Sequence, residues 1–154
     1  MPNGAELSPP TLRVFIYDHL LVHGIPPSSG EIGRHFGVSA DKARQALGSL
    51  GIGKTVLPHP QTGEIWMAGP FASGPSAYRV IGSSAAWWAN CAWDMLGIAV
   101  IADETVRVET TCTDCGEAIE LDVVPERGVV SDVPGMVVHF LLPARRWYDD
   151  IGYT

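Results

Sequence analysis

The 154-residue chain carries 17 acidic and 10 basic residues, for a formal net charge of −7, and it is 46% hydrophobic. This composition is typical of a globular protein and excludes a disordered chain. The length allows one domain or two small ones, and no apolar run reaches the roughly 18 residues that a membrane-spanning helix requires. Residues 1–10 contain neither a basic nor an apolar segment, so we expect no signal peptide.

Charge and cysteine content restrict the partners and the compartment. Residues 1–82 carry six basic and five acidic residues, whereas residues 83–154 carry four basic and twelve acidic residues. The acidic second half excludes nucleic acid and anionic membranes as its binding partners. Three cysteines are an odd number in a chain without a predicted secretion signal, which favours reduced thiols in the cytoplasm over a disulfide framework.

The first half is predicted to form three helices followed by a β-hairpin. Apolar residues recur at helical spacing, serines stand at the expected helix starts, and glycines stand at the expected ends. The expected helices and strands cover residues 11–23, 30–36, 39–50, 55–57 and 64–67. This order of elements predicts a winged-helix-like domain over residues 1–82.

Residues 27–39 also resemble the helix-turn-helix of many bacterial regulators. A DNA-reading role would place the third predicted helix in a major groove. DNA readers bring a basic stripe, and here only Arg34, Lys42 and Arg44 supply one. We therefore expect no nucleic-acid partner and favour a structural or lid role for this domain.

The second half, residues 83–154, is expected to pack one helix on a mainly antiparallel sheet, so the predicted fold class is α+β. The helix would start at a cap formed by Ser83 or Ser84 and would end near Gly97. Strands are expected at residues 105–110, 119–124 and 135–142, and a short strand at residues 78–81 precedes the boundary near residue 82.

Cys91 and Asp94 lie three residues apart in an otherwise apolar stretch, so a helix would place them on one face. In apolar surroundings a carboxyl group tends to keep its proton, and a thiol meets soft electrophiles away from water. A single buried cysteine is most often a small core residue. An aspartate, however, is almost never fully buried without a partner, so Asp94 is expected on an exposed face or in a site.

Cys112 and Cys115 form a C-x-x-C motif, followed by Gly116, in a tight turn between two predicted strands. The motif is half of a zinc knuckle, which needs two more ligands. No other candidate ligand lies at knuckle spacing, so we expect no structural zinc there. The pair can still be a soft-metal site, a redox pair, or two thiols that are merely neighbours in a hairpin.

The second half resembles the organomercurial (alkylmercury) lyases from about residue 78 to the end. The similarity is clearest in Trp88-Ala89-Asn90-Cys91-Ala92-Trp93-Asp94-Met95-Leu96. Further matches follow in chain order: Val106-Arg107-Val108, Cys112, Gly116-Glu117-Ala118-Ile119 and Pro134-Gly135-Met136-Val137-Val138. The predicted winged helix is also in keeping with the architecture of that family.

The resemblance implies cleavage of a carbon–mercury bond by protonolysis, which yields a hydrocarbon and Hg(II). Mercury(II) prefers thiolate ligands, so Cys91 would capture the metal of the substrate. Asp94 would protonate the leaving carbon as a general acid. Trp88, Trp93 and Met95 would line the substrate pocket. No cofactor is implied, and the expected partners are an organomercurial substrate and low-molecular-weight thiols.

The sequence departs from the family at its end. The second catalytic cysteine of the family is expected immediately after Thr154, so the catalytic domain, residues 83–154, is expected to be incomplete at its C-terminus. Residue 155 would then be cysteine or, if a UGA codon is read through, selenocysteine; the alternative is a fragment of a longer chain. Cys112 matches a family cysteine that is not the catalytic partner, and Cys115 would substitute only if its turn reached Cys91.

Two further expectations accompany this interpretation. The 72 residues of the second half are few for a complete core, so an exposed apolar sheet edge or self-association is expected. Two other functions stay open. One is a helix-turn-helix regulator or sensor that uses Cys91, Cys112 and Cys115 as soft-metal ligands. The other is a relative of the lyases that binds thiophilic metal without turnover.

Overall fold

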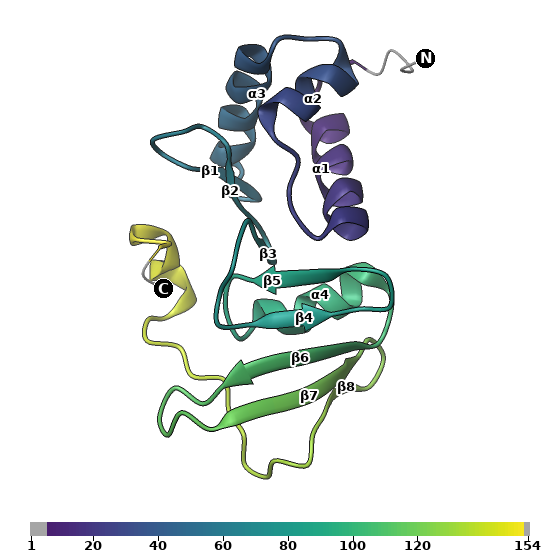
Figure 1. Cartoon of the computed structure of the whole chain (residues 1–154). Helices are drawn as coiled ribbons and strands as arrows, with labels where there is room; N and C mark the ends of the chain where they lie inside the picture. The colour runs from purple at the N-terminus through teal and green to yellow at the C-terminus, as the bar shows by residue number, and fades with distance from the viewer. Residues whose placement is uncertain (1–5, 153–154) are drawn as a thin grey trace.

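A computed structural model describes residues 6–152 and has an α+β fold (Figure 1). Its helices are α1 (Pro9–His23), α2 (Ser29–Phe36), α3 (Ala40–Ile52), α4 (Asp94–Ala102) and the 3₁₀ helix η1 (Ala144–Asp149). Within that range, no helix has the length and apolar character needed to cross a membrane. Part of the segment considered for a signal peptide, and the end of the chain where a second thiol is expected, lie outside the described residues.

A single antiparallel sheet runs through both halves of the chain. Its strands are β1 (Val56–Pro58), β2 (Ile65–Ala68), β3 (Phe71–Ala72), β4 (Arg79–Ile81), β5 (Ala86–Ala89), β6 (Val106–Thr111), β7 (Ala118–Val124) and β8 (Gly128–Val130). They pair in the order β1-β2-β3-β5-β4-β6-β7-β8. Helices α1–α3 gather at one end of the molecule, and α4 packs on the middle strands (Figure 1).

Helices α2 and α3 begin where the sequence predicts, because serine side chains cap them. The Ser28 hydroxyl accepts the N–H of Glu31 at 3.3 Å, and the Glu31 carboxylate accepts the N–H of Ser28 at 2.8 Å. The Ser39 hydroxyl accepts the N–H of Lys42 at 3.2 Å. The three helices and the β1–β2 hairpin therefore occur close to the predicted positions, while the winged-helix interpretation and the division at residue 82 stay predictions.

Trp87 connects α1 to the middle of the sheet. Its side chain is 2% exposed, and its indole N–H donates to the carbonyl of Leu20 at 2.8 Å. Leu12, Ile16 and Leu20 of α1 are fully buried in the same core. The helical end of the molecule and the sheet thus share one hydrophobic core.

The helix predicted around residues 84–97 is wrong in its first part and at its end, because α4 continues to Ala102. Residues 86–89 form β5, which pairs with β3 on one side and β4 on the other. Trp87 and Ala89 face the core, and the residues between them are only partly buried, so the burial period is that of a strand. Aromatic residues are common in strands, and the pairing of β5 with β3 and β4 overrides the helical spacing of its apolar residues. Helix α4 starts only at Asp94.

The strand predicted at residues 135–142 is also wrong. This stretch makes no strand pairing in the described structure and leads from β8 into η1. Its apolar side chains pack singly: Met136 contacts the core, Phe140 contacts aromatic rings, and Val137 is 81% exposed. The apolar residues that suggested a buried strand therefore make individual side-chain contacts from an irregular segment. The strands predicted near residues 78–81, 105–110 and 119–124 are present as β4, β6 and β7.

Replacing Trp87 by phenylalanine should destabilise the fold by about 2 kcal/mol, because the change removes a buried hydrogen bond and leaves a small void. Urea unfolding followed by circular dichroism measures the loss. Trp88→Phe is the matched control, since Trp88 is the next residue of β5 and is only partly buried. Equal losses in the two variants would contradict the role given to Trp87.

Candidate active site

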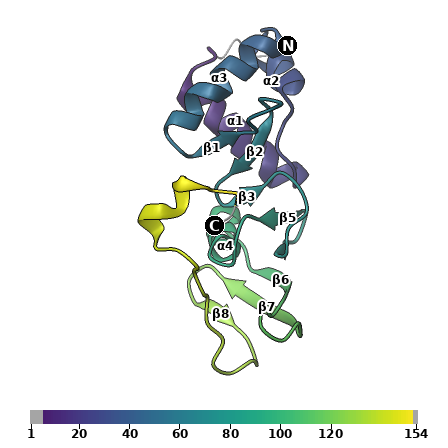
Figure 2. The same ribbon diagram turned by 90° about the vertical axis from the view of Figure 1, so that its left-hand side faces the viewer.

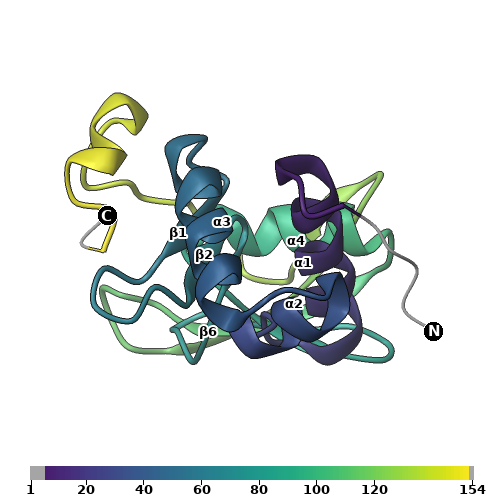
Figure 3. The ribbon, with the colours of Figure 1, turned by 90° about the horizontal axis from the view of Figure 1, so that it is seen from above.

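A cavity of about 360 Å³ contains Cys91 and Asp94. Three parts of the chain form its walls: the β1–β2 region, the turn between β5 and α4, and the C-terminal stretch, which comprises residues 131–152 after β8. The lining residues are Lys54, Thr55, Leu57, Met67, Gly69, Asn90, Cys91, Asp94, Phe140, Trp147, Tyr148, Ile151 and Gly152. Figures 2 and 3 show the C-terminal stretch returning alongside β1 and β2, on the side of the molecule away from α1.

The Cys91 thiol lies at the amino-terminal end of α4. The Cys91 carbonyl accepts the N–H of Met95 at 3.2 Å, and the N–H groups of Asp94 and Trp93 donate to the Cys91 sulfur. These donors and the helix dipole favour a negative charge on the sulfur. Cys91 and Asp94 are therefore brought together as predicted, but by the turn into a helix and not by a shared helical face.

Burial controls the protonation of both groups. Burial raises the pKa of the Asp94 carboxyl, although hydrogen bonds from the Asn90 amide and the Cys91 thiol partly offset it. Burial also raises the pKa of the Cys91 thiol, and the nearby charge of Asp94 raises it further. Because burial is the largest cause of both shifts, each group keeps its proton to a higher pH than the same side chain would in water.

The C-terminal stretch is attached to the first half of the chain through Lys54. The Tyr148 hydroxyl donates to the Lys54 carbonyl at 3.3 Å, and the Lys54 ammonium lies 4.1 Å from the centre of the Tyr148 ring. Phe140 contacts Trp147 with ring centres 5.2 Å apart and Trp93 with ring centres 6.3 Å apart. Together these contacts give the cavity an aromatic outer wall.

The residues predicted to line the pocket are not those that do. Met95 is 5% exposed and belongs to the core, because the first turn of α4 directs it inward. Trp88 is part of β5, and Trp93 is 57% exposed and reaches the cavity only through its contact with Phe140. None of the three is among the lining residues. The expectation assumed one helix for the whole stretch, whereas Trp88 lies in β5, Trp93 in the turn and Met95 in α4.

Sequence reasoning missed Asn90 and the aromatic wall. Asn90 lines the cavity beside Asp94, and its Oδ1 atom is buried without a hydrogen-bond partner among the described residues. Its position next to Cys91 was a signal that could have been used. Phe140, Trp147 and Tyr148 gave no such signal, because they lie about fifty residues further along the chain.

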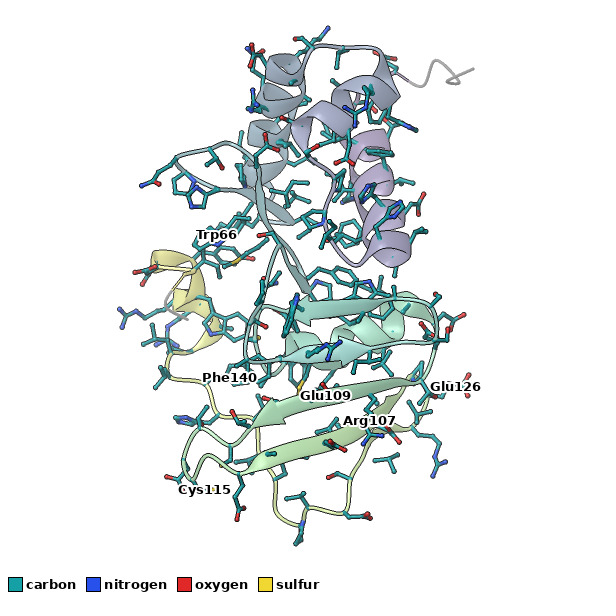
Figure 4. The ribbon with its side chains drawn as sticks, in the orientation of Figure 1. Trp66, Arg107, Glu109, Cys115, Glu126 and Phe140 are labelled. Atoms are coloured by element: carbon teal, nitrogen blue, oxygen red, sulfur yellow. The ribbon has the colours of Figure 1, made fainter. Side chains whose placement is uncertain are left out.

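Cys112 and Cys115 lie apart from this cavity. They occupy the turn between β6 and β7, where Figure 4 shows Cys115 at the tip. The backbone N–H groups of Cys115 and Asp114 donate to the Cys112 sulfur and lower the pKa of Cys112. All three cysteines are outside disulfides, and no group of three or more metal-binding side chains occurs in residues 6–152. Cys115 therefore does not supply a second thiol to the cavity.

The site thus places a partly buried thiol, hydrogen-bonded to a carboxyl group, at the start of a helix and under an aromatic wall, an arrangement that suits an enzyme acting on thiophilic substrates. A family model described as MerB, alkylmercury lyase, matches residues 71–154. Because this match covers more than half of the chain, the protein belongs to the alkylmercury lyase family.

A solved structure, the mercury-bound form of MerB2, has the same fold. It superimposes with a TM-score of 0.62 at 18% sequence identity, over 85% of this chain and 62% of that protein. The chain thus spans less than two thirds of the length of that relative. A comparison with curated proteins finds no match.

Replacing Asp94 by asparagine should lower the pKa of Cys91, because the change removes the negative charge beside the thiol while the backbone N–H donors stay. The pH dependence of alkylation by iodoacetamide measures this shift, in chains where Cys112 and Cys115 are serine. The midpoint should move to lower pH relative to the same chain with Asp94 intact. An unchanged midpoint would show that the two groups are not coupled.

Proposed function

We propose that this protein cleaves carbon–mercury bonds by protonolysis, with Cys91 as the mercury-capturing thiol and Asp94 as the proton donor. The observation that carries the proposal is the hydrogen-bonded pair of Cys91 and Asp94 inside a cavity with an aromatic wall. Membership of the alkylmercury lyase family supports the same reaction.

In the first step, the Cys91 sulfur forms a bond to the mercury of R–Hg–X, and X leaves. A thiol must lose its proton when it binds a metal. Its hydrogen-bond partner Asp94 is placed to accept that proton, and burial favours the neutral carboxyl that results. Capture of the metal therefore prepares the acid for the next step.

In the second step, Asp94 returns the proton to the carbon while the carbon–mercury bond breaks. The electron pair of that bond goes to the new carbon–hydrogen bond, so the leaving group departs as a neutral hydrocarbon. Hg(II) stays on the Cys91 sulfur and Asp94 becomes a carboxylate. The hydrogen bond from the Asn90 amide stabilises this charged product state.

The reaction requires no cofactor, because sulfur ligation and proton transfer account for all the bonds that change. Cys91 is the single cysteine that lines the cavity within residues 6–152. We infer that a low-molecular-weight thiol provides the second sulfur ligand that removes Hg(II). Such thiols are abundant in a reducing cytoplasm, which is also the compartment that suits three unpaired cysteines.

A regulatory role in DNA binding has less support. Arg44 of α3 forms ion pairs with Asp41 at 2.7 Å and with Glu64 at 3.2 Å. Its charge is therefore partly neutralised, and few basic side chains of this helix are left to contact DNA. The first half instead provides a wall of the cavity through Lys54, Thr55 and Met67. We propose a structural role for this half and no nucleic-acid partner.

Self-association is supported by the last strand of the sheet. Strand β8 is an edge strand, and its Val129 and Val130 are 43% and 44% exposed. An exposed apolar edge of this kind is a template for pairing with another chain. We infer that a second copy pairs there.

With an aryl-mercury substrate and excess thiol, Asp94→Asn should release arene about 10²–10⁴ times more slowly than the unaltered chain, because the general acid is lost. The variant should still bind mercury through Cys91. Gas chromatography measures arene, and mass spectrometry measures bound metal. Asp18→Asn, a change in α1 outside the cavity, is the matched control.

Cys91→Ser separates the proposed enzyme from a metal binder. The variant should release no arene, because no thiol in the cavity can capture the metal. Mercury binding by the unaltered chain without any arene release would support a thiol-based heavy-metal binder and would refute the lyase.

Phe140→Ala should lower kcat/KM for an aryl-mercury substrate about tenfold, since one ring contact of roughly 1–1.5 kcal/mol is lost. The value for methylmercury should change less, because a methyl group makes no stacking contact. Steady-state rates of hydrocarbon release measure both. Val137→Ala is the control, because Val137 lies in the same stretch but is 81% exposed and does not line the cavity. Equal losses for the two substrates would contradict the assignment of the aromatic wall.

A further inference from the structure

The turn between β6 and β7 holds two cysteines that the cavity does not use. The strands remain paired up to Thr111 and Ala118, and the turn is closed by the N–H of Cys112 on the carbonyl of Glu117 at 2.8 Å. A second bond joins the N–H of Gly116 to the carbonyl of Cys112 at 2.9 Å. The turn is therefore a defined structure that fixes both cysteines at one end of a hairpin.

Within this turn the two sulfur atoms are neighbours. The Cys112 sulfur accepts the backbone N–H groups of Cys115 and Asp114 and is hydrogen-bonded to the Cys115 thiol. Gly116 has a φ of +76°, a left-handed conformation that lets the chain leave the turn directly after the second cysteine. N–H groups aimed at sulfur are the groups that stabilise a metal-bound thiolate.

The surroundings of the pair define the metal it suits. Cys115 is exposed and Cys112 is partly exposed, so an ion from solvent can reach both. Asp114 lies within the turn and Glu117 at its end, which favours cations. Residues 6–152 bring no third metal-binding side chain to the pair. A structural zinc ion needs four ligands, whereas mercury(II) is soft and is satisfied by two thiolates in a linear arrangement.

We propose that Cys112 and Cys115 form a second site, at the surface and apart from the cavity that holds Cys91. This site chelates a soft metal ion, Hg(II), through its two sulfur atoms. Binding forms two sulfur–mercury bonds and releases two protons to solvent, with no change in oxidation state. The exposed side chains rotate so that the sulfurs take positions on either side of the metal. The site does not depend on catalysis at Cys91 and is present in a chain that lacks that thiol.

Two single variants with the same number of thiols test the proposal. Cys91→Ser keeps the turn pair, whereas Cys115→Ser keeps Cys91 and Cys112, which lie in different parts of the structure. Each full-length variant is loaded with one equivalent of Hg(II) and titrated with glutathione, and native mass spectrometry records bound metal per chain. Cys91→Ser should retain one Hg(II) per monomer up to a glutathione concentration about a hundredfold higher than Cys115→Ser does, because two linked thiols act as a chelate.

Cys112→Ser, measured in the same way, should behave as Cys115→Ser does. Equal retention in all three variants would overturn the proposal, because it would show that single thiols account for binding. One Hg(II) shared between two chains would also overturn it. Arene release by Cys115→Ser, measured separately, should stay at the level of the unaltered chain, so a failure of the surface site is distinguishable from a failure of the lyase.

Discussion

The pairing of β5 with strands on both of its sides fixes the position of the whole candidate site. Because β3 and β4 hold β5 along its length, the chain leaves the sheet at a defined point and must turn at Asn90 and Cys91 before α4 can begin. That turn exposes the first N–H groups of α4 to the Cys91 sulfur. Trp87 also attaches this strand to α1, through the hydrogen bond from its indole N–H to the carbonyl of Leu20. The position of Cys91 thus depends on a strand that carries no reactive group.

Local signals in the sequence were sufficient for much of the fold. Serines at helix starts, glycines at helix ends and alternating apolar residues gave three helices and most of the strands, since these features act through neighbours in the chain. The stretch from Trp87 to Asp94 was assigned to a helix because its apolar residues fit either period. Only its pairing with β3 and β4, which sequence patterns do not encode locally, decides for a strand.

The candidate site was predictable to a similar extent. Cys91 and Asp94 stood out because they are close in sequence and chemically unusual in an apolar stretch, but only the resemblance to the alkylmercury lyases suggested roles for them. Lys54 and Tyr148 were not found, because their contact joins residues 94 positions apart and leaves no pattern in either segment. Asn90 was missed for another reason: its position beside Cys91 is a weak signal by itself, and what marks it in residues 6–152 is a buried side-chain oxygen without a hydrogen-bond partner.

The cavity has walls from three segments that are distant in the chain, and this has a consequence for local stability. Up to residue 152, the C-terminal stretch is attached mainly through exposed or partly exposed side chains and contains no β-strand, so its opening costs less free energy than opening the core. A molecule that fills the cavity touches this stretch and the β1–β2 region at once. Occupancy would therefore hold this stretch against the rest of the fold and make the protein more resistant to proteases there.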